Sequence, residues 1–139
     1  MDRIERWDSE LTYFAESVRR DDYAWGQTDC ASIVRRGLML LYGKDIWKGA
    51  VPSYRSIKGA VRVAGSHDII EVLEGTGAKE IQPGFATAGD VAVLSDPEYP
   101  LPRVALLIMG RKALVSDPDK GVSIIDHLLL NDPRFFRYE

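Results

Sequence analysis

Cysteine and histidine are scarce in this chain of 139 residues, which has one cysteine, Cys30, and two histidines, His67 and His127. A single cysteine excludes an intrachain disulfide framework and any multi-cysteine zinc site. The two histidines are far apart in the sequence and lack the spacing of metal ligands. We therefore expect neither a metal ion nor another cofactor.

An excess of charge of one sign is also lacking, because 18 Lys and Arg face 21 Asp and Glu and the formal net charge is -3. Binding to nucleic-acid phosphates depends on clustered Lys and Arg, and the two basic pairs, Arg19-Arg20 and Arg35-Arg36, fit solvated helix faces. No apolar run approaches the length of a membrane span, and the charged residues 1–6 are unlike a secretory signal. These features predict a protein made in a cytoplasm, with no nucleic-acid partner and no membrane span.

The stretch from Tyr23 to Gly43 organises the rest of the sequence. An aromatic, glycine-containing loop leads to Thr28 and Asp29, either of which can cap a helix start. Apolar residues then recur at helical spacing, and Gly43 suits the C-terminal cap. The apolar face comprises Ile33, Val34, Gly37, Leu38, Leu41 and Tyr42. This pattern predicts a helix with Cys30 in its first turn and on its buried face.

Cys30 has two interpretations. A thiol at a helix N-terminus interacts with the positive end of the helix dipole, which lowers the thiol pKa toward the nucleophilic range. Free cysteine is also among the most buried residue types, so Cys30 can equally be a small apolar residue packed under the helix start. The spacing alone favours the packed residue.

The remaining segments divide into helices first and strands second. Helices are predicted over 3–18 and 56–64, the second ended by Gly65, and in a short piece that Ser66 caps, with His67 in its first turn. Strands are predicted over 79–82, 91–94, 104–109, 112–115, 122–125 and 135–138. This order predicts one α+β domain over residues 1–139, with the Cys30 helix packed on an antiparallel sheet of four to six strands.

Some apolar positions are candidates for an exposed interaction surface. They are Trp47, Leu101 and the run Leu128-Leu129-Leu130. The leucine run can be an interaction patch or the inside of a short helix between two strands, and we favour the short helix.

Several motifs together resemble a known family. Tyr23-x-Trp25-Gly26 is followed by Asp29-Cys30-Ala31-x-Ile33-Val34, and later by Gly89-Asp90-Val91 and a strand ending in Gly110. These motifs resemble the NlpC-type branch of the papain-like cell-wall peptidases. Over residues 3–138 the chain is also similar to a family of small phage and prophage proteins, related to that branch and encoded among tail genes. The resemblance implies a papain-like, NlpC-type fold.

The same resemblance implies a cysteine peptidase that cuts peptide stems of peptidoglycan. A Cys thiolate attacks the amide carbonyl, a His on the facing strand exchanges the proton, and a third polar residue orients the His. Cys30 matches the nucleophile, but Arg103 holds the place of the His and cannot act as a general base because it stays protonated. The orienting residue, usually His, Asn or Gln, would fall near Val115 or Ser116 on the next strand, and neither is one of these residues.

The resemblance also suggests binding residues. Tyr23, Trp25, Gly26 and Asp29 belong to the loop that forms one wall of the family's cleft, and Asp90 is expected to fix its strand entrance as a turn or cap partner. For Arg103 the sequence leaves two interpretations: an ion pair with the Cys30 thiolate, or a strand-end residue reaching solvent or Asp96, which we favour.

The sequence leaves three functions open. The first is a phage tail-tip or tail-associated virion protein with a degenerate catalytic apparatus, made in the cytoplasm of a bacterial host. Its role would be structural, or it would bind other tail proteins or the host peptidoglycan. The second is an active cysteine peptidase or amidase, which needs a base from His67, His127 or a partner chain within hydrogen-bond reach of Cys30. The third is a cytoplasmic assembly factor that is absent from the finished particle.

Overall fold

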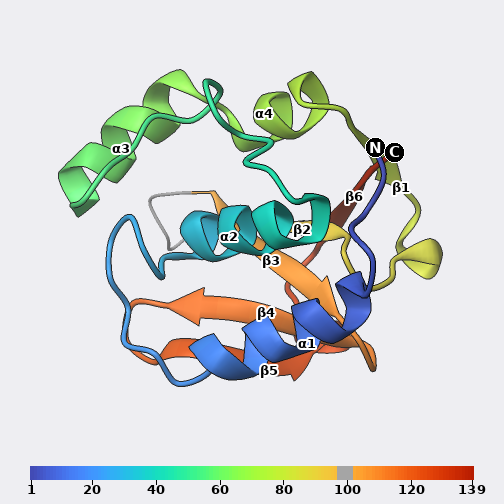
Figure 1. Cartoon of the computed structure of the whole chain (residues 1–139). Coiled ribbons are helices and arrows are strands. Elements are labelled where there is room, and N and C mark those ends of the chain that lie inside the picture. Colours follow the sequence, from blue (N-terminus) through green and yellow to red (C-terminus); the bar gives the residue numbers. More distant parts are fainter. Residues whose placement is uncertain (97–101) are drawn as a thin grey trace.

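The computed structural model describes residues 1–96 and 102–139, in which helices come first and strands second (Figure 1). The helices are α1 (Trp7–Val18), α2 (Cys30–Tyr42), α3 (Ile57–Ser66) and α4 (Ile69–Gly75). The strands are β1 (Ala78–Ile81), β2 (Val91–Leu94), β3 (Arg103–Ile108), β4 (Lys112–Asp117), β5 (Gly121–Asp126) and β6 (Arg134–Tyr138). Two single 3-10 turns, η1 (Pro83–Phe85) and η2 (His127–Leu129), lie between strands.

The six strands form one antiparallel sheet in the order β1-β6-β2-β3-β4-β5. The last strand of the chain, β6, lies between β1 and β2, where Phe136 pairs with Glu80 on one side and with Val91 on the other. This insertion brings the two ends of the chain side by side (Figure 1). The predicted α+β fold is confirmed, and its sheet has the largest predicted number of strands.

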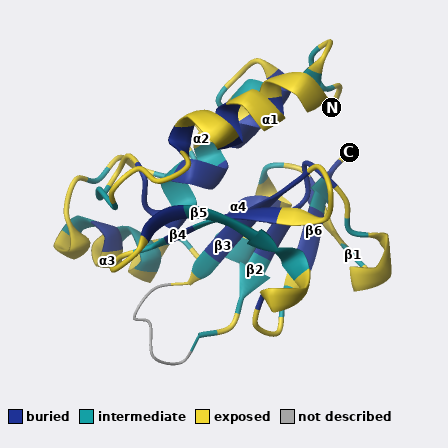
Figure 2. Ribbon diagram, turned by 90° about the horizontal axis from the view of Figure 1, so that it is seen from below, coloured by how far each residue is buried: buried dark blue, intermediate teal, exposed yellow. Residues whose placement is uncertain are grey.

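Helices α1 and α2 cover one face of the sheet, and each turns its buried side toward it (Figure 2). The buried residues of α2 include Ile33, Val34, Leu38 and Leu41, all fully buried, as the apolar periodicity predicts. They pack on β3 and β4 in the main hydrophobic core, which also contains Cys30. The Cys30 helix therefore lies on the sheet as expected.

Both ends of α2 follow the signals in the sequence. The Asp29 carboxylate accepts a hydrogen bond from the Ser32 backbone N–H at 3.1 Å, so Asp29 rather than Thr28 is the N-cap. Gly43 ends the helix in the left-handed region, with φ +70°.

Helix α1 begins later than predicted. Arg6 adopts a left-handed conformation with φ +61°, and the residues before it run as an irregular segment. The Ile4 backbone N–H donates to the Leu41 carbonyl at 2.8 Å, which ties this segment to the end of α2. The charged start of the chain is therefore bound to the helix layer without being helical.

The boundary between α3 and α4 was also predicted incorrectly. Helix α3 continues through Gly65 to Ser66, and His67 is its C-terminal cap residue rather than part of the next helix. Asp68, not Ser66, caps α4, because its carboxylate accepts from the backbone N–H groups of Ile70 and Glu71. Ser66 cannot cap α4, because it is still part of α3 and an N-cap residue needs a non-helical conformation.

Two predictions about apolar exposure were wrong. Trp47 is 1% exposed, and its indole N–H donates to Tyr138 Oη at 2.8 Å. The short helix η2 exists, but it exposes Leu128 and Leu129 by 76% and 72%, because one 3-10 turn is too short to bury both. Leu130 alone is buried, and Leu101 lies outside the described residues.

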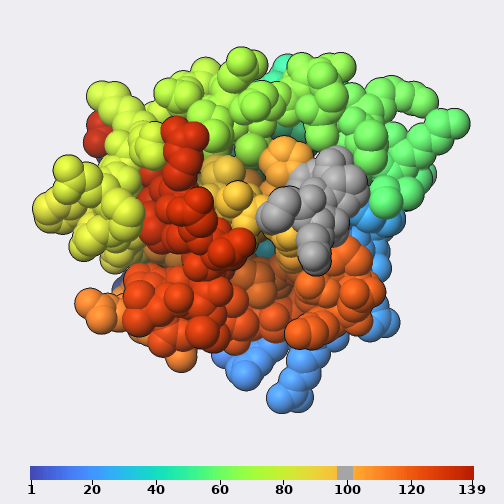
Figure 3. Space-filling model, turned by 180° about the vertical axis from the view of Figure 1, so that it is seen from behind, coloured from blue at the N-terminus to red at the C-terminus, as the bar shows by residue number. Residues whose placement is uncertain are grey.

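The second face of the sheet carries a smaller apolar cluster, composed of Ala92, Ala105, Leu107, Ala113, Leu130 and Phe135. Neither α1 nor α2 covers this face, which Figure 3 shows with a hollow at its centre. The sheet therefore separates two apolar layers, and Cys30 belongs to the layer on the helix side.

Candidate functional site

The loop before α2 is closed by its own hydrogen bonds, which fix the position of Cys30. The backbone N–H groups of residues 27–29 donate to the Ala24 carbonyl, and Thr28 Oγ1 joins Ala24 N–H to the Asp22 carbonyl. Gly26 has φ +80°, and a Cβ there would overlap the backbone carbonyl of Tyr54. This loop, residues 23–29, is called the Trp-Gly loop below, and it packs directly on the chain segment that leads to α3.

Asp29 is a buried carboxylate that accepts four hydrogen bonds. It accepts from the Gly26 N–H at 2.6 Å, the Ser32 N–H at 3.1 Å, Ser32 Oγ at 2.7 Å and Tyr54 Oη at 2.6 Å. Burial, and then the negative charge of Asp29, raise the pKa of Tyr54, which remains a hydroxyl donor. Asp29 therefore joins the Trp-Gly loop, α2 and Tyr54.

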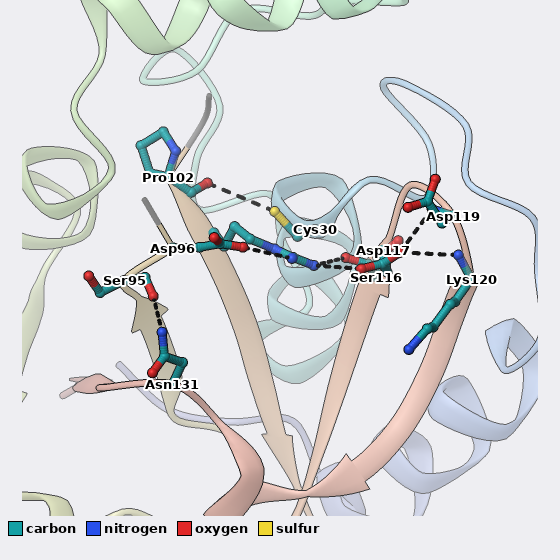
Figure 4. A network of polar contacts seen from close by, with 10 residues as sticks. Cys30, Ser95, Asp96, Pro102, Ser116, Asp117, Asp119, Lys120 and Asn131 are labelled. Atoms are coloured by element: carbon teal, nitrogen blue, oxygen red, sulfur yellow. Dashed lines mark hydrogen bonds and ion pairs between the residues drawn. The ribbon is translucent and has the colours of Figure 1, made fainter. Parts of the chain in front are cut away.

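Cys30 is 7% exposed, and its thiol makes one long contact, with the Pro102 carbonyl at 4.0 Å (Figure 4). Burial raises the pKa of this thiol above its ordinary value, and the negative charge of Asp29 adds to the increase. A backbone contact with Val104 and the positive charge of Arg103 oppose the shift without cancelling it. The structure therefore favours a protonated thiol, contrary to the thiolate that the helix N-terminus alone suggests.

The thiol forms part of the wall of a cavity of about 70 Å³. The cavity lies between the start of α2, the helices α3 and α4, and the start of β3, and its lining includes the aromatic side chains of Tyr23, Trp25 and Tyr54. Of the predicted binding residues, Tyr23, Trp25 and Asp29 meet here with Cys30, whereas Gly26 and Asp90 do not line this cavity.

Arg103 lies on the opposite face of β3 from Cys30. Side chains alternate along a strand, and Val104 shares the helix-side core with Cys30, whereas Ala105 belongs to the cluster on the other face. Arg103 shares the face of Ala105, and Val104 is the β3 residue that lines the Cys30 cavity. On the β3 face toward Cys30, the structure thus places a valine, which has no acid–base group.

The Arg103 side chain instead connects three strands at their ends. Its guanidinium lies 3.4 Å from the Asp96 carboxylate and 3.7 Å from the Asp117 carboxylate, and it donates to the Ser116 carbonyl at 2.8 Å. Figure 4 shows these contacts, with Asp96 and Asp117 on opposite sides. The predicted contact with Asp96 is confirmed.

Ser116 lies on the Cys30 side of β4. Its hydroxyl donates to the Thr28 carbonyl, so the side chain ties β4 to the loop before α2. The residue is 1% exposed. Ser116 therefore supports the position of Cys30 through the backbone of the loop.

His67 lines the same cavity as Cys30, which the sequence did not predict. Its Nδ1 lies 3.2 Å from the Val63 carbonyl of α3. His127 lies on η2, where its backbone N–H donates to Arg111. Both histidines are in the described part of the chain, and no hydrogen bond joins either imidazole to Cys30.

Asp90 is fully buried at the entrance of β2, away from Cys30. Its carboxylate accepts from the Thr87 N–H at 2.8 Å, as predicted for a turn partner. It also accepts two hydrogen bonds of 2.9 Å from the Arg137 guanidinium on β6. Asp90 therefore connects the turn before β2 to the last strand, β6.

Within residues 1–96 and 102–139, no helix combines the length and apolar character needed to cross a membrane. The same residues contain no group of three or more His, Cys, Asp or Glu side chains that could hold a metal ion.

The helix layer, the antiparallel sheet and a cysteine at the start of the central helix define an α+β fold of the NlpC/p60 type. The crystal structure of the NlpC/p60 domain of the peptidoglycan hydrolase SagA is similar, with a TM-score of 0.61 and 18% sequence identity, over 95% of this chain and 98% of that chain. The sequence profile of the family described as "Domain of unknown function (DUF6950)" matches residues 2–133, and the chain belongs to this family. None of the curated proteins matches the sequence.

Proposed function

We propose that this protein is a binding or structural protein on an NlpC/p60-type fold in which the hydrolytic centre is not assembled, and that it is associated with a phage tail. The observation that carries this proposal is the environment of Cys30: a buried thiol with a raised pKa and Val104 on the facing strand. Nucleophilic catalysis requires a thiolate, or a base that removes the proton. The site provides neither within hydrogen-bond reach among the described residues.

The resemblance to tail-encoded proteins supports the assignment to a phage tail, with the protein made in the cytoplasm of the bacterial host and retained in the virion. The fold of the SagA domain, which belongs to a peptidoglycan hydrolase, supports host peptidoglycan as one candidate partner. Neighbouring tail proteins are the other candidates. In this function the fold supplies a surface and a pocket, and Cys30 supplies packing.

Phage carrying the substitution Cys30→Ala, which removes only the thiol group, tests this proposal. We expect unchanged plaque formation, the protein present in purified virions by mass spectrometry, and no fragments released from purified peptidoglycan by the wild-type protein. Loss of infectivity with a folded Cys30→Ala protein would contradict the proposal. Absence of the protein from purified virions would instead favour an assembly factor.

One observation favours a second function, that of a cysteine peptidase or amidase. His67 lines the cavity that Cys30 lines, so an imidazole and a thiol share one site. The pair would have to approach to about 3 Å for proton transfer. If the wild-type protein releases peptides from peptidoglycan, and Cys30→Ala and His67→Gln both abolish release while His127→Gln does not, this second function replaces the first.

A further inference from the structure

A hollow of about 500 Å³ lies between η1 and the hairpin that joins β3 to β4. It is lined by residues 84–88 and 107–111 and by His127 at the start of η2. It shares no lining residue with the cavity beside Cys30. Sites that bind ligands commonly have volumes of about 300–1,000 Å³, so this hollow has the size of a binding site.

Large apolar side chains are exposed in and beside this hollow. Phe85 and Met109 line it and are 69% and 50% exposed. Leu128 and Leu129, which are exposed by more than 70%, belong to the same turn as the lining residue His127. Exposed apolar side chains that gather beside a hollow mark an interaction site. A ligand confined to the hollow would leave both leucines in water, so a partner that covers them must extend beyond it.

The ionisable side chains of the lining belong to two basic residues, Arg111 and His127, and no Asp or Glu is among the described residues that line it. Within the described part of the chain, neither side chain has a hydrogen bond or an ion pair. The nearby Asp126 carboxylate instead caps η2, accepting from the Leu128 N–H at 2.9 Å. Arg111 is a permanent cation and His127 can donate a hydrogen bond, so the hollow offers two donors to a carboxylate.

The turn between β3 and β4 places Arg111 opposite His127. The Arg111 carbonyl accepts from the His127 N–H at 3.0 Å, which extends the β4–β5 ladder by one residue on each strand. Gly110 and Arg111 both have positive φ, +76° and +60°. Such a two-residue turn favours glycine or asparagine, and another residue adopts this conformation at a cost in free energy. The turn therefore does not account for an arginine at position 111.

We propose that residues 84–88, 107–111 and 127–129, called the η2 surface below, form a docking site for a partner polypeptide that presents a carboxylate beside apolar side chains. The carboxylate binds Arg111 and His127, and the apolar side chains cover the exposed ones of the η2 surface. The charge of the lining favours an acidic partner over a basic one, and the exposed leucines outside the hollow favour a polypeptide over a small molecule. The inference rests on the proposed binding function, and it names the surface and the chemistry of the partner.

Short synthetic peptides test this proposal on the isotope-labelled full chain. The first carries leucine and phenylalanine flanked by glutamates, the second has lysines in place of the glutamates, and the third has glycines in place of the apolar residues. An NMR titration measures the dissociation constant of each peptide and locates its site from the amide shifts. We expect the first peptide to bind at least about tenfold more tightly than the other two, with its shifts on the η2 surface, because only this peptide matches both the charge and the apolar groups.

Variants at exposed positions provide a matched comparison. Arg111→Gln removes one cation of the site and should weaken binding of the first peptide by about twofold to fivefold, the value of one exposed ion pair. Phe85→Ala removes an exposed ring of the hollow and should weaken it as well. Arg62→Gln removes an exposed arginine of α3, far from the hollow in the sequence, and should leave the affinity unchanged. Circular dichroism establishes that the three variants are folded, and the comparison of peptides on the unaltered chain is decisive without them.

Several results would overturn the inference. Shifts that are absent or lie elsewhere, or equal affinity for the glutamate and lysine peptides, would remove the site or its charge preference. Phenylpropionate that binds as tightly as the first peptide would make the hollow a small-molecule site. A dimer of the isolated chain that protects the same amides would assign the surface to a second copy. All of these measurements use the isolated chain without peptidoglycan or virions, so failure of the η2 surface is distinguishable from failure of the proposed function.

Discussion

At Cys30, burial and the helix N-terminus act on the same proton in opposite directions, and burial decides the outcome. The folded protein holds the thiol proton more tightly than the unfolded chain, whose thiol pKa is about 8.5. The stability that Cys30 contributes is therefore complete below that pH, and it is lost as the pH rises toward the folded-state pKa.

We predict that alkylation of Cys30 by iodoacetamide in the folded protein has its inflection at a higher pH than in the urea-unfolded protein. The reason is that desolvation disfavours the reactive thiolate. Intact mass measures the rate, because the chain has one cysteine. An inflection below the unfolded value would mean an activated thiolate and would support the peptidase function.

Two buried tyrosine hydroxyls in contact with the same core differ in their partners. The Tyr42 and Tyr138 rings lie 5.9 Å apart, edge to face. Tyr138 Oη accepts from the Trp47 indole at 2.8 Å and lies 2.8 Å from Thr76 Oγ1. Among the described residues, Tyr42 Oη is buried without a hydrogen-bond partner.

Replacing each tyrosine by phenylalanine should therefore have different effects. Tyr42→Phe removes an unsatisfied group, and its free energy of unfolding should be unchanged or about 1 kcal/mol higher. Tyr138→Phe leaves the Trp47 indole N–H unpaired, and its free energy of unfolding should fall by about 1–3 kcal/mol. Urea denaturation measures both, and an equal loss in the two variants would contradict this assignment.

At the scale of single elements, strand β6 carries two arginines that differ in burial. Arg137 donates to Asp90, which is fully buried, and Arg134 donates to Glu80, whose side chain is 45% exposed. Hydrogen bonding to Arg134 lowers the pKa of Glu80. The two arginine–carboxylate pairs of β6 thus differ in the burial of the carboxylate, which is complete for Asp90 and partial for Glu80.

We predict that Arg137→Ala lowers the free energy of unfolding by about 3–5 kcal/mol, because it leaves the Asp90 carboxylate buried without its cation. Arg134→Ala, the matched control, should lower it by about 0–1 kcal/mol, since Glu80 remains hydrated. Thermal and urea unfolding compare the two. Similar losses would show that burial of Asp90 has no energetic role.

An element could be predicted from the sequence where the residues that determine it are close together in the chain. Helix α2 was predicted with its ends because the apolar period lies within it and the caps Asp29 and Gly43 lie directly beside it. The direction of Arg103 was not predictable, because residues 104–108 are apolar on both faces and show no alternation. Pairing with β2 and β4 sets the register and places Val104 toward Cys30.

At the scale of the whole molecule, contacts across long stretches of sequence determine which residues meet. Asp90 and Arg137 are 47 residues apart, and Trp47 and Tyr138 are 91 residues apart. Both contacts depend on the insertion of β6 into the sheet. The position of His67 on the cavity wall depends in the same way on how α3 and α4 fold over α2, and no local signal in the sequence indicates it.

The same architecture predicts unequal protection of the helices. Amides of α3 should exchange with deuterium much faster than amides of α2, because one residue of α3 is buried and seven of α2 are. Tyr54→Phe, which removes the hydrogen bond to Asp29, should increase exchange in α3 further while α2 is unchanged. Tyr13, which is 76% exposed, provides the control variant Tyr13→Phe, with no expected change.

Hydrogen exchange by mass spectrometry of peptides covering 57–66 and 30–42 measures this difference. Equal protection of the two helices would mean that α3 opens only when the molecule unfolds, and the cavity would then be closed to any partner. Faster exchange in α3 alone would mean that the wall of the cavity opens while Cys30 stays at the start of an intact α2.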